Sequence, residues 1–422
     1  MTATHPASAE RGGTLPPRGA LGLIFDPVFG ALFWGKMFSV VAVWTHGLVA
    51  AIVMYQATRS ALMVGLVGVV QFAPQLILSP VSGKWADTGE PMRQILLGRV
   101  LCVAGSGLIA VWMFVQPDST GMAAGLPVLL GTLLVGFGFV VGGPAMQSVV
   151  PNLIRDGELS TAMALNSMPM TVGRIVGPAL GAYLAAHLGA ASAFALSAVL
   201  HAVFAFFLLA ITFPRPPAHP PGTDYRVRVA LRYVWRDRPL LLALLGVTAV
   251  GLASDSSITL TPSLADALGG GARMVGTLSA VFGVGSAVGM ISLAMMRGRL
   301  ASTKVSTIGL ATLAAGCAVP AVATTPAVAL AGFALAGLAF GWAMTGLSTL
   351  VQERAPEELR GRIMALWLVG FLGSRPLAAA LLGGTADTLG VHAAFGLAAV
   401  SCLVAALWCR PAKLGGPLPS SV

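Results

Sequence analysis

Two matching stretches of the chain decide its architecture: MALNSMPMTVGRIVGPALGAYLAAHLGAASAF at 163–194 and MALWLVGFLGSRPLAAALLGGTADTLGVHAAF at 364–395. Both begin with Met-Ala-Leu, and both carry an arginine, a glycine and a phenylalanine at matching places 201 positions apart. A second echo opens the two halves, an Asp-Pro pair at 26–27 and an Asp-Arg-Pro triplet at 237–239. The chain is therefore predicted to be an internal duplication in which each half forms one bundle of helices.

The composition is that of a membrane protein. Of 422 residues, 56% are hydrophobic and 9% are charged, and the mean hydropathy is +0.85. Soluble domains carry about 25% charged residues, so this chain cannot cover a water-facing surface. Runs near the length of about 20 residues that spans a bilayer occur at 28–54, 61–82, 94–116, 124–150, 161–187, 191–213, 240–264, 273–296, 305–324, 327–350, 363–386 and 392–409. Twelve runs, six in each half, predict an all-α membrane protein made of two pseudo-symmetric six-helix bundles.

The positive charges indicate the orientation of the chain. Of the 25 Lys and Arg residues, we assign 20, Arg99 among them, to the side of the two termini, 2 to the opposite side and 3 to the spans. The three in spans are Lys36, Arg174 and Arg375. This asymmetry predicts a multi-pass membrane protein with both termini in the cytoplasm. The net charge of +10 is dispersed over short loops, which argues against a nucleic-acid partner.

Five segments follow from this interpretation. Residues 1–20 are polar, lack the apolar centre of a signal peptide, and are expected to be a disordered cytoplasmic N-terminus. We expect one bundle at 21–213, the other at 240–410 and a cytoplasmic tail at 411–422. The linker at 214–239 holds arginines near helical spacing, which predicts an amphipathic helix on the inner leaflet. The predicted apolar face of this helix comprises Val227, Leu231, Val234 and Trp235.

The loop after the second run reads GKWADTGEPMR at 83–93. Glycines permit a tight turn there, and an acid in the turn can sit against a helix N-terminus or an arginine. The loop resembles the G-x-x-x-D-x-G-x-x-x-R signature of the major facilitator superfamily, with Gly83, Asp87, Gly89 and Arg93 at the signature positions. The resemblance implies that the acid latches the start of the eleventh helix, where this chain has Arg360 and Arg362. A loop that only fixes topology is the simpler alternative, and the matching loop at 297–300 has lost the acid.

The fifth run contains GRIVGPALGA at 173–182. Glycines four residues apart form a flat face for close helix packing, and a proline introduces a bend. The segment resembles the G-x-x-x-G-P-x-x-G-G motif of facilitator antiporters, which in that family accompanies export. The matching residues are Gly173, Gly177, Pro178 and Gly181, with Arg174 inside the motif. Ala182 and Leu165 depart from the family pattern, so plain helix packing stays open as an alternative.

The resemblance extends over nearly the whole chain, from the first run to the 353–395 block. It is to the bacterial efflux branch of the superfamily, which includes enterobactin-exporter-like and macrolide-efflux-like transporters. It implies an exporter in the bacterial cytoplasmic membrane and leaves the cargo open.

Ionisable groups inside spans are functional candidates, because a charge at mid-bilayer costs about 2.5–3.5 kcal/mol on insertion scales. Asp255 is the acid placed well inside a span and is the first candidate for proton coupling, unless it is merely hydrated near the outer end. His46 could relay protons or contact cargo, or it could be a hydrogen-bonded core histidine. Arg174 and Arg375, the repeat partners, could bind an anionic group, or could reach carbonyls or the interface.

Met and aromatic side chains suit an apolar cargo, although each alone is more often part of the packing. The predicted lining of the substrate cavity comprises Trp44, Gln75, Gln147, Met170, Trp342, Met344 and Arg375. The sequence shows no Walker loop, no metal-ligand motif and no catalytic cluster, so we expect neither a cofactor nor an enzyme.

The prediction is a monomeric secondary active transporter that exports an amphipathic small molecule, such as a drug, antibiotic or siderophore, by proton antiport with alternating access. Its closest rival is a proton-coupled importer of a small metabolite. A membrane enzyme would need a catalytic cluster, and a non-transporting receptor or scaffold would not need the gate at Asp87.

Overall fold

The computed structural model describes residues 17–88, 90–117, 119–155, 157–209, 227–296, 300–356 and 359–416. This part of the chain is helical and contains no strand, and twelve of its helices have 17 residues or more. The first bundle comprises α2 (Phe29–Thr58), α3 (Ala61–Thr88), α4 (Pro91–Val115), α5 (Met122–Ser148), α6 (Leu159–His187) and α7 (Ala190–Leu209). The second bundle comprises α9 (Arg238–Thr259), α11 (Gly271–Met295), α12 (Ser302–Ala318), α13 (Pro326–Arg354), α14 (Arg360–Leu389) and α15 (Val391–Trp408). The remaining elements are α1 (Ala20–Ile24), α8 (Val227–Arg236), α10 (Thr261–Ala267), α16 (Pro411–Leu414) and the 3-10 turns η1 (Val150–Leu153) and η2 (Pro320–Val322).

The twelve long helices coincide with the twelve predicted runs, so the predicted all-α fold of two six-helix bundles is confirmed. Ten of them are long and apolar enough to cross a membrane. The seventh run was predicted as one span over 240–264, but it is divided into α9 and α10 at Leu260. Pro262 lies in the first turn of α10, where its missing N–H costs nothing, whereas in a continuous helix it would break a hydrogen bond.

The position of Arg99 corrects the predicted assignment of charges to the two sides of the membrane. It was assigned to the side of the termini, but it lies within α4 and is fully buried. Its guanidinium donates to Ser39 on α2 and to the carbonyl of Gly138 on α5, the latter at 3.4 Å. These bonds explain how an arginine is tolerated between helices, because each replaces a bond to water that burial removes.

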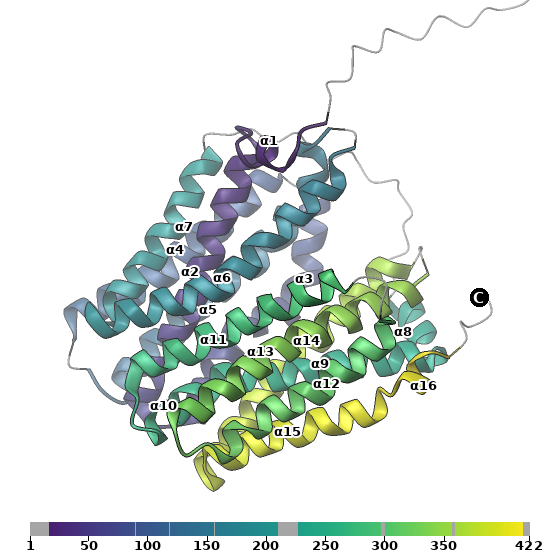
Figure 1. The fold of residues 1–422 in the computed structure, drawn as a ribbon. Coiled ribbons are helices and arrows are strands. Elements are labelled where there is room, and N and C mark those ends of the chain that lie inside the picture. Colours follow the sequence, from purple (N-terminus) through teal and green to yellow (C-terminus); the bar gives the residue numbers. More distant parts are fainter. Residues whose placement is uncertain are drawn as a thin grey trace, which may run out of the picture.

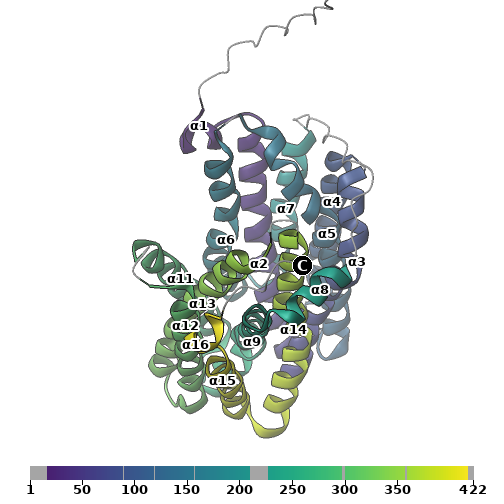
Figure 2. The ribbon, with the colours of Figure 1, turned by 90° about the vertical axis from the view of Figure 1, so that its right-hand side faces the viewer.

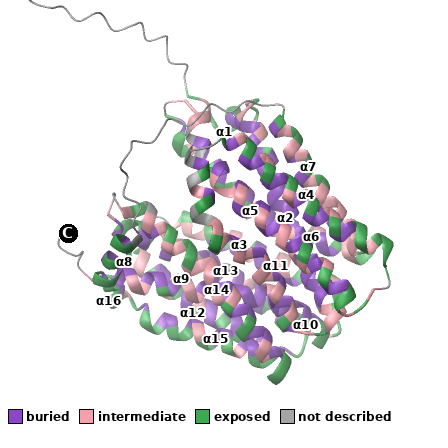
Figure 3. Cartoon of the chain, turned by 180° about the vertical axis from the view of Figure 1, so that it is seen from behind, coloured by how far each residue is buried: buried purple, intermediate pink, exposed green. Residues whose placement is uncertain are grey.

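Small residues bring neighbouring helices into close contact. A Cβ added to Gly98 on α4 would lie 2.6 Å from the carbonyl oxygen of Gly138 on α5, closer than atoms can approach. Large apolar side chains instead remain exposed on helices such as α4, α7 and α15. Figure 3 shows exposed residues along the outside of the bundles. Helices packed by small residues and covered outside by apolar side chains are suited to lipid, where packing rather than hydrophobic exclusion holds the bundle together.

Two ends of the molecule can be distinguished (Figure 1). The termini end holds α1, η1, α8, α16 and the starts of α2, α6 and α14; the far end holds α10 and the starts of α3 and α11. The bundles converge toward the far end and spread apart toward α1 and α8 (Figures 1 and 2). α3 packs on α14 across the two halves, and α6 packs on α11.

Burial along these helices agrees with that shape. On α14, Gly383 and Ala379 are buried against α3, but Leu368, farther toward the termini end, is exposed. On α6, Ala182 is buried against Gly276 of α11, whereas Met168 is exposed. The same sides of the helices therefore touch the other half near the far end and face open space near the termini end. The structure is open toward the termini end.

The linker helix differs in part from its prediction. α8 lies within the expected segment, and Val234 is buried as predicted, together with Ala230 and Tyr233, against the second bundle. Leu231 and Trp235, predicted for the same face, are exposed, Trp235 by 70%. The helix packs on protein rather than presenting a single apolar face to lipid. The predicted N-terminal segment up to residue 16, the linker up to residue 226 and the tail from residue 417 lie outside the described residues.

Candidate functional site

Two arginines from the repeat meet aromatic rings where the halves join. The guanidinium carbon of Arg174 on α6 lies 4.1 Å from the ring centre of Phe340 on α13 and 5.1 Å from that of Phe282 on α11. It also lies 5.3 Å from the ring of Trp44 on α2. Because Trp44 belongs to the first half and both phenylalanines to the second, Arg174 bridges the two halves. Cation–π contacts of this kind stabilise a guanidinium without neutralising its charge.

Arg375 on α14 has the equivalent place in the second half. Its guanidinium carbon lies 5.0 Å from the ring centre of Phe72 on α3 and 5.1 Å from that of Phe371. Phe371 in turn stacks near Phe340, with ring centres 6.2 Å apart. We call Trp44, Phe72, Arg174, Phe282, Phe340, Phe371 and Arg375 the central cluster. It joins six helices, and the charges of its two arginines interact.

Asp255 on α9 lies next to this cluster. It is 4% exposed, its carboxylate accepts a hydrogen bond of 2.7 Å from Thr259, and its charge interacts with that of Arg375. The alternative that Asp255 is merely hydrated near one end does not fit this burial. The structure therefore places the predicted proton-coupling acid beside one of the two repeat arginines.

The glycines of the antiporter-like motif hold α6 against α2. A Cβ on Gly177 would lie 2.5 Å from the Cβ of Trp44 and 2.9 Å from the carbonyl oxygen of Val41. A Cβ on Gly173 would lie 2.7 Å from a methyl group of Val40. The motif thus acts through close packing in this structure, and the packing sets Trp44 beside Arg174.

His46 is fully buried inside the first bundle. Its two ring nitrogens each lie 3.0 Å from a hydroxyl, that of Ser106 on α4 and that of Thr132 on α5. Its ring also packs edge-on against Phe194 of α7. This is the geometry of a hydrogen-bonded core histidine joining four helices, and it lies in the half opposite to Asp255.

The other predicted lining residues lie in different places. Gln147 accepts a 2.6 Å bond from Asn166, which holds the ammonium of Lys36 at 2.7 Å near the termini end. Met170 is exposed on α6. Trp342 donates to Ser292 at 2.9 Å between α13 and α11.

Two lining predictions concern residues closer to the central cluster. Met344 packs against the core of the second bundle. Gln75 lies on α3, three residues after Phe72, and is half-buried. Of the predicted lining residues, Trp44 and Arg375 belong to the central cluster.

Sequence reasoning missed most of the rings in this cluster. Phe371 lies four residues before Arg375, a spacing that puts both on one face of a helix, so it was within reach of sequence analysis. Phe282 and Phe340 come from other helices and have no local signal.

The far end is closed by two acids of the second half that bind the first half. Asp387 at the end of α14 accepts from the backbone N–H groups of Ala61 and Leu62, at 2.7 and 3.2 Å, and from the hydroxyl of Ser60. Asp266 on α10 pairs with Arg59 at 3.0 Å. We call Asp266, Asp387, Arg59 and Ser60 the far-end latch. An acid at the first turn of α3 satisfies N–H groups that lack partners within the helix.

The predicted gating loop lies at the opposite end of the same helix. Asp87 is in the last turn of α3, its side chain and Gly89 lie outside the described residues, and Gly83 is inside the helix rather than in a turn. Arg93 pairs with Glu90 at 2.7 Å, both exposed. α14 begins at Arg360, three residues before the predicted run at 363–386, with Arg362 in its first turn. Because the bundles are apart at this end, the predicted latch stays a prediction.

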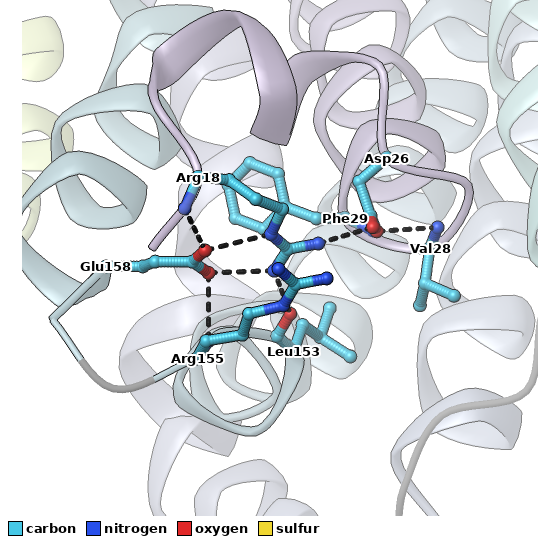
Figure 4. A network of polar contacts seen from close by, with 7 residues as sticks. All are labelled: Arg18, Asp26, Val28, Phe29, Leu153, Arg155 and Glu158. Carbon is cyan, nitrogen blue, oxygen red and sulfur yellow. Dashed lines mark hydrogen bonds and ion pairs between the residues drawn. The ribbon is translucent and has the colours of Figure 1, made fainter. Parts of the chain in front are cut away.

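A partly buried ion-pair network ties the start of the first bundle together (Figure 4). Asp26 caps α2 by accepting from the N–H groups of Val28 and Phe29, at 3.0 and 2.8 Å. Arg18 joins Asp26 to Glu158 at the start of α6, with 2.8 Å between Arg18 Nη2 and Glu158 Oε2. The bonds from Arg18 hold the pKa of Glu158 down at about 2. An arginine here is paired with acids, in contrast to the central cluster.

The second half repeats this arrangement with different partners. Asp237 caps α9 by accepting from Leu240 N–H at 3.2 Å, and Arg354 at the end of α13 binds its two oxygens at 2.9 and 2.8 Å. Arg354 also donates to the carbonyl of Gly416, 2.8 Å away. The Asp-Pro echo of the sequence thus marks two capped helix starts, each locked to its own bundle by an arginine.

Comparison with known proteins gives consistent matches. A family model described as transmembrane secretion effector matches residues 19–416. The enterobactin exporter EntS of Salmonella choleraesuis is 31% identical over 378 residues, 85% of either chain, and that of Citrobacter koseri is 30% identical over 374 residues, again 85% of each.

Solved structures share the fold at low sequence identity. A bacterial homologue of the human lysosomal transporter Spinster, inward-facing and unoccupied, aligns with a TM-score of 0.71 and 13% identity over 92% of this chain and 97% of that one. A bacterial homologue of the iron transporter ferroportin, also inward-facing, aligns with a TM-score of 0.69 and 17% identity over 89% of this chain and 98% of the other.

Proposed function

Because the chain belongs to the transmembrane secretion effector family of the major facilitator superfamily, and is a multi-pass membrane transporter rather than an enzyme, we propose that it exports an amphipathic small molecule in exchange for protons. In this proposal the termini end faces the cytoplasm of a bacterium, and one chain suffices for transport. Among drugs, antibiotics and siderophores, the names of the relatives favour a siderophore as cargo.

One observation carries the proposal: Arg375 and Asp255 are buried, and Arg174 is partly buried, where the bundles meet in a molecule that is open toward the termini end. A site on the pseudo-two-fold axis is reached from one side at a time when the bundles rock. Cargo would enter from the cytoplasm, and the far-end latch would open to release it outside. Closure of the other end would bring Asp87 to Arg360 and Arg362.

Asp255 supplies the coupling in this scheme. When Asp255 is ionised, its negative charge partly neutralises the positive charge of Arg375. A proton arriving from outside would remove that charge and change what Arg375 attracts, so that proton binding and cargo binding depend on each other. His46, with both nitrogens bonded inside one bundle, is the alternative carrier.

The test is uptake of radiolabelled enterobactin into everted membrane vesicles energised by respiration. We expect uptake that a protonophore abolishes, and an Asp255→Asn variant that still binds cargo but lacks gradient-driven uptake. Glu353→Gln, at an exposed acid that binds Ser302, is the matched control and should transport normally.

The other outcomes are informative as well. Uptake that persists without a proton gradient would contradict the coupling. If the pH dependence of uptake is unchanged in Asp255→Asn, the proton carrier would be His46 instead. Uptake only into right-side-out vesicles would identify an importer.

A further inference from the structure

The two arginines of the central cluster lack the carboxylate partners that Arg18 and Arg354 have. Arg354 is buried, Arg18 is partly buried, and both bind carboxylates. The fully buried Arg99 has no carboxylate, but it donates to Ser39 and to the carbonyl of Gly138. In the part of the chain that the structure describes, neither Arg174 nor Arg375 has a carboxylate within ion-pair distance or any hydrogen bond, and the Nε of Arg375 is a buried donor without an acceptor. Native proteins rarely leave such donors unmatched without a functional reason.

The charges around the cluster do not balance. Arg375 is 3% exposed, and both it and Arg174 bear a positive charge, while Asp255 is the acid nearby and its carboxylate is bonded to Thr259. One unit of positive charge remains uncompensated even when Asp255 is ionised. The aromatic rings stabilise the guanidinium groups but carry no net charge.

From this imbalance we propose that Arg174 and Arg375 form the binding site for an organic anion with an aromatic ring, such as an aryl carboxylate or a phenolate. The anionic oxygens would accept hydrogen bonds from one or both guanidinium groups, which present donors in a planar fork. The ring of the cargo would pack among Trp44, Phe72, Phe340 and Phe371. A cationic amphiphile meets two like charges there and is excluded.

The repeat explains why two arginines serve one ligand. They are 201 positions apart, one on each half, and each contacts rings of the other half. An anion bound between the two guanidinium groups would therefore contact both bundles, so its binding can affect both of them. This inference rests on the proposed transport function, since it names the class of cargo for that site.

The test measures binding to the purified full-length protein in detergent by isothermal titration calorimetry. Three probes of one shape are compared: 1-naphthoate, its neutral amide 1-naphthamide, and 1-naphthylmethylammonium. We expect 1-naphthoate to bind at least tenfold more tightly than the amide, and the ammonium compound not to bind. Equal affinity for the acid and the amide would overturn the proposal.

The variants Arg174→Gln and Arg375→Gln should each weaken 1-naphthoate binding about tenfold and leave binding of the amide unchanged. Arg273→Gln, an equal loss of charge at an exposed site on α11, should bind as the wild type does. If a Gln variant does not fold, Arg375→Lys keeps the charge but not the fork, and should keep part of the preference for the anion. A folded Gln or Lys variant whose anion affinity equals that of the wild type would contradict the assignment.

Vesicle transport separates the two proposals. If the protein binds 1-naphthoate but moves no cargo, the proposed anion site stands and the proposed export function is rejected. If the protein exports an uncharged or cationic cargo in a proton-driven manner and shows no preference for the anion, the export function stands and the proposed anion site is rejected.

Discussion

Replacing Asp387 by alanine tests whether the far-end latch holds the structure open toward the termini end. Asp387 belongs to α14 of the second half but caps the first turn of α3 in the first half. Its three bonds exist only while the far end is closed. The substitution therefore destabilises this state selectively and shifts the equilibrium toward a state in which the far end is open.

The size of the effect follows from the contacts. Removal of an acid that caps a helix costs about 1 kcal/mol. The pair between Arg59 and Asp266 remains, and because both side chains are exposed, by 67% and 51%, it contributes between about 0 and 1 kcal/mol. A loss of about 1 kcal/mol corresponds to a roughly five-fold change in the ratio of the two states.

Spin labels provide the assay. Met122→Cys at the start of α5 and Leu389→Cys at the end of α14 are both exposed, by 49% and 74%, and lie on opposite halves at the far end. The four native cysteines are buried and should not react. Pulsed dipolar spectroscopy should show the ratio of the longer-distance to the shorter-distance population rise about five-fold in Asp387→Ala.

The neighbouring Thr388→Ala is the control, because Thr388 bonds only to carbonyls of its own helix in the described structure. Its distance distribution should match that of the wild type. If Asp387→Ala gives that same distribution, the cap does not set the balance of states and the reasoning is refuted.

Two further predictions concern packing and the ion-pair network. Gly177→Ala places a Cβ 2.5 Å from that of Trp44, so we expect a loss of about 1–3 kcal/mol in stability and altered tryptophan fluorescence. Gly107→Ala, where the Cβ meets nothing within 4 Å, should show neither change. Glu158→Gln should lower the thermal midpoint at pH 7, and this loss should vanish as the pH falls from about 4.5 toward about 2, because the ionised form of Glu158 stabilises the fold and its pKa is lowered to about 2. A midpoint difference that is equally large at pH 7 and below pH 3 would show that charge is not the cause.

The sequence alone was sufficient for the span pattern and the duplication. Each of the twelve long helices lies over a predicted apolar run, because a helix in lipid satisfies its backbone within one continuous segment. The repeat of Arg174 and Arg375 was likewise visible as a spacing. These are local properties, which depend on composition and length rather than on the arrangement of helices.

Tertiary structure alone decided which of these residues meet. Phe282 and Phe340 surround Arg174, and Asp387 caps α3, through contacts between segments more than 100 positions apart. Such contacts depend on how each helix is rotated and on which state the bundles adopt, and neither leaves a signal in the spacing of one segment. Arg99 shows the same limit, because its bonds to two other helices, and not its place in the chain, make it a buried residue.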